Sequence, residues 1–251
     1  MNERPRRPRT LRPSRRLTAF VLLFLPIVLA LGVWQLRRAE EKATLEARAA
    51  ERAARPPRPI DELPQPVPAE LELLRVQVEG TVLRERVLLL DNRTWQGRPG
   101  YELWAPVVHA PGRAVLVSFG WVAAPRRRSE LPEPALPPGR VRLTGRLLLA
   151  DDGPPVFGAS EETGWPRRVQ RVDPDAQDRL FPSVSLAPWR IVADPDAPGV
   201  ATWTWAPVRM SADRHRAYAA QWFGLGAVLV LGWLAASLRR VHAGDVEEES
   251  E

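Results

Sequence analysis

The residues best suited to chemistry in this 251-residue chain lie in RHRAYAAQWF, residues 214–223. If a helix begins near Asp213, then His215, Tyr218 and Trp222 fall at positions i, i+3 and i+7 and share one helix face. An imidazole in that position is suited to binding a metal, including the iron of a flat haem ligand. Trp and Tyr are also enriched at membrane interfaces as anchors. Residue types and spacing alone therefore leave a ligand site and a membrane anchor open.

Catalytic motifs are missing from the rest of the sequence. It contains no GxSxG elbow, no HExxH, no phosphate-binding Gly-rich loop and no cysteine. The acidic pairs at 151–152 and 161–162 lie in polar, loop-like sequence, where carboxylates are ordinarily solvated. His109 is most simply a turn residue and His242 a solvated tail residue. The sequence predicts a protein that is not an enzyme and has no catalytic residues.

Two long apolar runs flank the middle of the chain. Residues 17–36 and 217–238 contain no charged residue and no histidine, and each matches the roughly 20 residues that span a bilayer. The alternatives are a cleaved signal peptide for the first run and a buried core helix for the second. The first run is too long for a signal peptide and continues into a charged helix. We expect transmembrane helices at 17–36 and 213–238, the latter including its first turn.

The positive charge is concentrated at the N-terminus. The arm 1–16 carries seven Arg against one Glu and so accounts for the whole net charge of +6. Such an arm is typical of a cytoplasmic flank. The pair Arg239-Arg240 after the second run likewise indicates that this end lies in the cytoplasm. The distribution argues against nucleic-acid binding, which requires a basic folded domain. It predicts a multi-pass plasma-membrane protein with both termini in the cytoplasm.

The segment between the apolar runs divides into a linker and a β domain. Residues 37–70 begin with strong helix formers and become Pro-rich from Pro56, which predicts a helical extension followed by an extended linker. Residues 71–212 contain short apolar segments separated by Gly and Pro, which is typical of a mainly-β domain, barrel or sandwich-like. The polar stretch 150–179 is predicted to be a loop, and 239–251 an acidic cytoplasmic tail. The strands are expected at 73–83, 86–92, 101–108, 114–122, 141–149, 189–193 and 200–208.

Four motifs resemble, in order, those of the surfeit locus protein 1 family. LGVWQLRRAEEK (31–42) resembles its G-x-W-Q-x-x-R-x-x-x-K signature, and GRPGYELWAPVV (97–108) its G-x-x-G-Y segment. AVLVSFGWVAAPRR (114–127) is similar to V-L-V-N-R-G-W-V, with Ser118-Phe119 in place of Asn-Arg, and 214–226 to H-x-x-Y-A-x-Q-W-F. Besides those in the last motif, the matching residues are Trp34, Gln35, Arg38, Lys42, Gly100, Tyr101, Gly120 and Trp121.

The resemblance implies a function in the biogenesis of haem-copper cytochrome c oxidase. Bacterial members of that family are associated with binding haem a and presenting it to the catalytic subunit. The resemblance then makes His215 the axial ligand, places Tyr218 and Trp222 against the macrocycle, and lets Gln221 bond a propionate or the second imidazole nitrogen. The implied partners are cytochrome c oxidase subunit I or other assembly factors, and the lipid bilayer. The alternative is a cofactor-free scaffold that stabilises an assembly intermediate.

One packing expectation follows from Gln35. An amide near hydrocarbon tends to find a partner across a helix interface. We therefore expect the two membrane helices to pack together, with Gln35 near Gln221 or Trp222.

Overall fold

The computed structural model describes residues 9–11, 13–149, 164–173, 177–206 and 210–240. The acidic pairs at 151–152 and 161–162 and the tail residue His242 lie outside this range. The chain forms two compact units, Met1–Glu46 with Val208–Glu251, and Ala47–Pro207.

The first unit is built on two helices, α1 (Arg15–Ala54) and α3 (Ala212–Ser237). Helix α1 passes into the second unit at Ala47 and ends just before Pro56-Pro57, as predicted. Helix α3 begins one residue before the predicted start, where the hydroxyl of the N-cap residue Ser211 accepts a hydrogen bond from the backbone N–H of Arg214. The short strands β1 (Arg9–Leu11) and β10 (Leu238–Arg240) pair antiparallel beside the helix ends.

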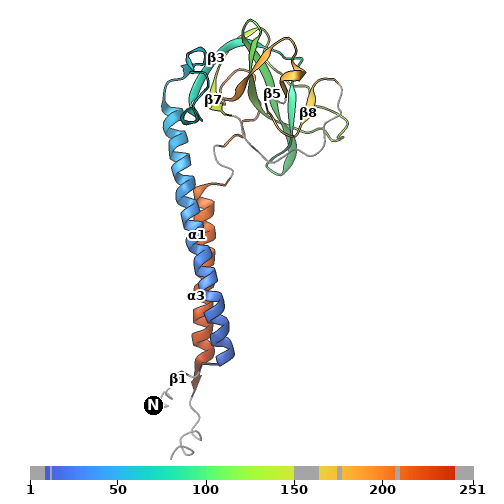
Figure 1. The fold of residues 1–251 in the computed structure, drawn as a ribbon. Helices are drawn as coiled ribbons and strands as arrows, with labels where there is room; N and C mark the ends of the chain where they lie inside the picture. The colour runs from blue at the N-terminus through green and yellow to red at the C-terminus, as the bar shows by residue number, and fades with distance from the viewer. Residues whose placement is uncertain (1–8, 12, 150–163, 174–176, 207–209, 241–251) are drawn as a thin grey trace, which may run out of the picture. The chain divides into compact units, whose positions relative to one another are not determined.

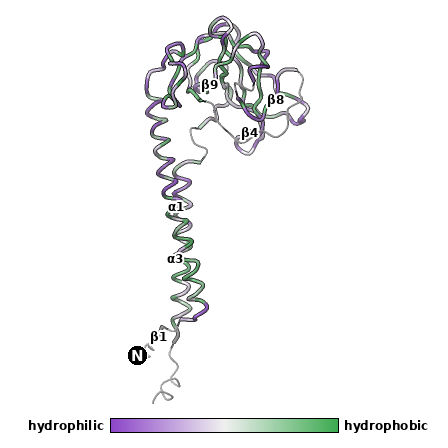
Figure 2. Tube along the Cα trace, viewed as in Figure 1, coloured by the Kyte–Doolittle hydropathy of each residue, from purple (hydrophilic) through white to green (hydrophobic). Residues whose placement is uncertain are grey.

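Both helices contain a stretch long and apolar enough to cross a membrane. Only 17% of that stretch in α1 and 11% in α3 is buried, so these are not the core helices of a soluble fold. Figure 2 shows hydrophobic residues along the first part of α1 and along α3, and hydrophilic ones along the later part of α1. The apolar side chains therefore face outward, where a bilayer would cover them.

The two helices pack side by side and antiparallel through small residues (Figure 1). A Cβ atom added to Gly32 would lie 2.7 Å from the ring of Phe223, and Gly226 lies against three aliphatic side chains of α1. The indole N–H of Trp233 donates a hydrogen bond of 3.0 Å to the hydroxyl of Thr18. Close approach at glycines and bonding between polar side chains are characteristic of membrane helix pairs. The predicted packing of the two helices is confirmed.

The second unit is a β-barrel with added strands. Strands β3 (Arg75–Val82), β7 (Arg140–Leu148), β9 (Ser185–Ala193), β6 (Arg113–Ala123) and β5 (Arg98–Ala110) lie in this order, and β3 also pairs with β5, which closes the barrel. Strands β4 (Leu88–Trp95) and β8 (Arg167–Val169) extend the sheet from β5, and β2 (Arg58–Pro59) extends it from β3. The 3-10 turns are η1 (Ile60–Glu62), η2 (Ala69–Leu71) and η3 (Asp178–Leu180). The predicted fold class is confirmed, with a barrel between the terminal helices.

Two apolar clusters explain the strand patterns. Strand β3 alternates, because only one of its faces meets the barrel core, whereas β6 is buried from Ala114 to Trp121 on both faces. The second face of β6 is covered by a smaller cluster that includes Phe181 and Val172, from the segment after β8. The barrel core contains Val76, Val78, Leu103, Val115, Val117, Phe119, Leu143, Leu147 and Ile191.

Two expectations about the β unit were wrong. The segment 200–208 is not a strand over its described residues, where only Thr202 forms an isolated bridge, with Trp121. Its Trp-x-Trp pattern instead places the indoles of Trp203 and Trp205 6.2 Å apart, with the Arg146 guanidinium over both. In the predicted loop 150–179, of which 150–163 and 174–176 lie outside the described residues, β8 forms and η3 overlaps the end; elements of three residues are too short to produce a periodic signal.

Candidate functional site

His215 lies on the stripe of α3 that faces α1. The buried residues of this stripe are Ala212, His215, Ala219 and Gly226, whose spacing follows the helical repeat. Only 8% of His215 is exposed. The imidazole is thus part of the helix interface.

The partner of His215 is Gln35 from α1. The imidazole Nδ1 and the amide Oε1 of Gln35 are 2.7 Å apart. Because an amide oxygen only accepts hydrogen bonds, Nδ1 carries the proton, and the neutral imidazole then has its lone pair on Nε2. The contact therefore selects the tautomer in which Nε2 is unprotonated.

The expectation that Gln35 lies near Gln221 is corrected by this contact, and the alternative that it lies near Trp222 stays a prediction. Gln221 follows His215 by six residues, which places it about 120° around the helix from the α1-facing stripe. It is exposed, and it does not make the bond to the second imidazole nitrogen that the family resemblance implied. Gln35 makes that bond, because it approaches from the opposing helix.

The two aromatic candidates border His215 along α3. Tyr218 is 42% exposed and Trp222 is half-buried. At i+3 and i+7 they lie within about 60° of His215 on the helix circumference, on the same side. The helix therefore places a phenol and an indole next to the imidazole.

The other α1 motif residues have different surroundings. Trp34 is 51% exposed, Arg38 forms an exposed 2.6 Å ion pair with Glu41, and Lys42 is half-buried. Sequence reasoning missed Glu46, whose carboxylate accepts a 3.3 Å hydrogen bond from the backbone N–H of Ala212 at the start of α3. The spacing could have found it, because residues 35, 39, 42 and 46 lie on one face of a helix and Glu46 therefore shares the face of Gln35.

The motif residues of the β unit are structural. A Cβ atom at Gly100 would lie 2.4 Å from the Trp121 ring, and Gly120 has a φ of +84°, which favours glycine. The Trp121 indole, 7% exposed, donates a 3.0 Å hydrogen bond to the carbonyl of Arg93. Tyr101 is buried in the barrel core. These four residues therefore shape the junction of β4, β5 and β6.

The departure at Ser118-Phe119 also lies within the barrel. Phe119 is fully buried in the core. The hydroxyl of Ser118 is 2.7 Å from a carboxylate oxygen of Glu102, which lies 3.6 Å from the guanidinium of Arg93. A charged pair from β4 and β5 thus stands beside Ser118.

These features define a membrane protein with an outward-facing apolar helix near each end of the chain and a β-barrel between them in sequence. The chain belongs to the SURF1 family, whose model matches residues 22–227. This family acts in the assembly of cytochrome c oxidase and is a family of assembly factors rather than catalysts. No curated protein matches the chain.

Proposed function

We propose that the protein receives haem a at the end of its helix pair that carries His215 and presents it to subunit I of cytochrome c oxidase. The observation that carries the proposal is the Gln35–His215 contact, which holds a buried imidazole with its Nδ1 proton engaged. The family's function in oxidase assembly supports the choice of partner.

The residues present fit a haem ligand. Metal-binding histidines almost always donate their second ring N–H to an oxygen acceptor, which fixes the tautomer and ring orientation. The Oε1 atom of Gln35 provides that acceptor. In this proposal His215 ligates the iron through Nε2, Gln35 positions the imidazole, and Tyr218 and Trp222 supply aromatic surface. Haem, when bound, would supply the iron that the imidazole coordinates.

The place of His215 in the chain supports the same proposal. It follows the polar start of α3 and precedes the apolar stretch, with exposed Arg214 and Arg216 beside it. A hydrophobic macrocycle with anionic propionates is best held where apolar and cationic groups adjoin.

A cofactor-free scaffold is the second candidate function, and the burial of His215 favours it. The Gln35–His215 hydrogen bond lies between apolar helices and helps to join α1 to α3 without any cofactor. In that case the aromatic residues act as membrane anchors, and the partner is an oxidase subunit or another assembly factor.

The two candidates predict different results for His215→Ala. Haem ligation predicts that the variant, purified in detergent from cells making haem a, loses its Soret band while its membrane abundance is kept. The scaffold predicts no haem in the unaltered protein, with Trp222→Ala reducing membrane abundance. The paired measurement is haem per protein and protein per membrane. Unchanged haem content in His215→Ala would remove this residue as the ligand.

A further inference from the structure

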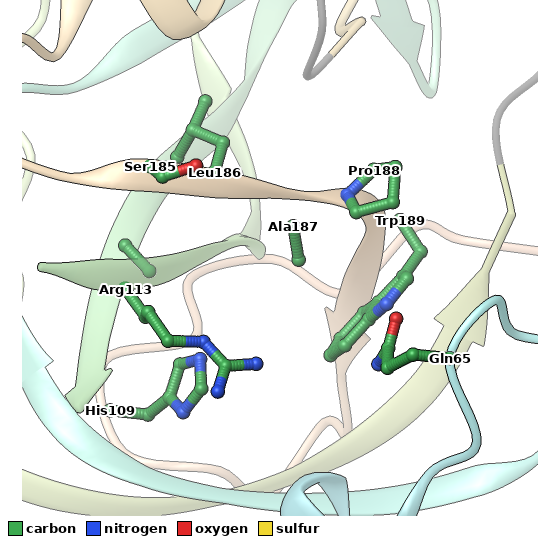
Figure 3. Close-up of a pocket in the computed structure, with 9 residues that line it drawn as sticks. Gln65, His109, Arg113, Ser185, Leu186, Ala187, Pro188 and Trp189 are labelled. Carbon is green, nitrogen blue, oxygen red and sulfur yellow. The ribbon is translucent and has the colours of Figure 1, made fainter.

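A cavity of about 180 Å³ lies in the β unit, where the β5–β6 hairpin meets the start of β9 (Figure 3). Its polar lining residues are Gln65, His109, Arg113, Ser185 and Trp189. Figure 3 shows Arg113 and His109 on one side and Trp189 and Gln65 on the other.

Local backbone features build this cavity. Gly112, with a φ of +68°, turns the chain between β5 and β6, and its carbonyl accepts a 2.8 Å hydrogen bond from the backbone N–H of Ser185. Strand β9 then bulges, because its register with β6 shifts between the pairs Ala114–Leu186 and Leu116–Arg190. A bulge redirects side chains, and here it directs the side chain of Trp189 into the barrel core.

Two buried polar groups of the lining lack hydrogen-bond partners among the described residues. They are the indole N–H of Trp189, a residue only 4% exposed, and Nδ1 of His109, whose side chain is 6% exposed. The carboxylate of Asp61 approaches that Nδ1 to 3.3 Å without hydrogen-bond alignment, and it is itself 74% exposed. Leaving a buried donor unsatisfied is costly, so the indole N–H of Trp189 favours a ligand that accepts hydrogen bonds.

The charge of the lining has one sign. Arg113 contributes a guanidinium, and none of the described residues that line the cavity is Asp or Glu, the exposed Asp61 carboxylate lying beside His109. Burial, with a smaller contribution from the Arg113 charge, lowers the pKa of His109 below its ordinary 6.5, against the opposing effect of Asp61. A cation beside an unsatisfied donor is complementary to an anion.

We propose that this cavity binds a small anionic group, a carboxylate or a phosphate, held by the Arg113 guanidinium and the Trp189 indole N–H. Ala187 and Pro188 provide apolar contact for the body that carries the anion. The site lies within the β unit and does not depend on haem binding.

The experiment titrates the full chain in detergent with sodium acetate and, separately, with inorganic phosphate, at constant ionic strength. Calorimetry reports the dissociation constant, and the indole N–H resonance of Trp189, identified by its loss in Trp189→Phe, reports the contact. We expect at least one anion to bind, with a downfield shift of that resonance. The anion with the lower dissociation constant shows whether the site prefers a carboxylate or a phosphate. Arg113→Gln should weaken binding at least about tenfold, and Trp189→Phe, which keeps the ring shape, should weaken it several-fold.

Arg98→Gln is the matched control, because Arg98 is an exposed arginine at the far end of β5 and does not line the cavity. The dissociation constant of each anion from the Arg98→Gln variant should equal that from the unaltered protein. Binding of neither anion, or equal weakening by Arg98→Gln and Arg113→Gln, would overturn the proposal. If Arg113→Gln loses the circular dichroism of the folded chain, the indole resonance and Trp189→Phe decide the outcome.

Discussion

At the scale of single residues, the Gln35–His215 contact makes each side chain depend on the other. Neither an amide nor an imidazole is favourable alone between apolar helices, and removing one leaves the other unpaired. In membrane helix pairs such bonds are worth about 0.6 kcal/mol on average. A modest effect on stability is therefore expected from changing either residue, and a larger one on any ligand that the imidazole binds.

Gln35→Leu tests whether Gln35 positions the haem ligand. Without its acceptor the imidazole loses a preferred tautomer, and second-shell changes of this kind typically weaken metal binding about 10- to 100-fold. We expect reduced haem retention and a shifted Soret maximum, measured by visible spectroscopy, with membrane abundance unchanged. Trp34→Leu, next in sequence and 51% exposed, should retain haem with the original spectrum. Identical spectra for both variants would contradict a positioning role.

His109 makes the stability of the protein depend on pH. Its folded-state pKa lies below 6.5, so between these two values the unfolded chain binds more protons and stability falls as pH falls. We expect Tm to decrease from pH 7.5 to pH 5.5, and the decrease to be smaller in His109→Gln. Thermal unfolding of both proteins across that range measures the difference. A steeper fall of Tm in the variant would mean that the folded-state pKa of His109 is raised and not lowered.

At the scale of elements, some glycines of α1 and α3 lie in the contact between the two helices and others lie outside it. The position of Gly32 has no room for a Cβ atom beside Phe223, whereas the position of Gly224 has no neighbour within 4 Å. The same substitution therefore has different expected costs at two glycines of the same helix pair.

Gly32→Ala should loosen the helix pair, because overpacking costs typically 1–3 kcal/mol. Cysteines placed at 35 and 215 report this packing without background, since the chain has no cysteine of its own. We expect efficient cross-linking by a short reagent in membranes, reduced by Gly32→Ala and unchanged by Gly224→Ala. Stronger cross-linking between 35 and 221 than between 35 and 215 would show that the observed register is incorrect.

At the scale of the whole molecule, the charged flanks predict the orientation in the membrane. Seven Arg in the arm 1–16 and the pair Arg239-Arg240 predict that both termini lie in the cytoplasm and the barrel outside. A reporter active only in the cytoplasm should work at either terminus and fail when inserted after Pro134. Activity at Pro134 would reverse the proposed topology, and with it the side from which a partner reaches the barrel.

The sequence by itself determined the features that depend on neighbouring residues. The length and charge exclusion of two runs predicted α1 and α3, and short apolar segments predicted six strands, because both signals are local in the chain. Spacing along one helix also placed His215, Tyr218 and Trp222 on one side of α3. Local pattern failed at 200–208, where Trp203 and Trp205 pack on Arg146 instead of forming a ladder.

Only the tertiary structure decided which distant residues meet. The pairing of β3 with β5 closes the barrel, and the register of α1 against α3 brings Gln35 to His215 across 180 positions of sequence. The cavity likewise joins His109 to Trp189 through a β-bulge that no local periodicity indicates. These contacts depend on the packing of whole elements, in which a shift of one residue exchanges the side chains that face each other.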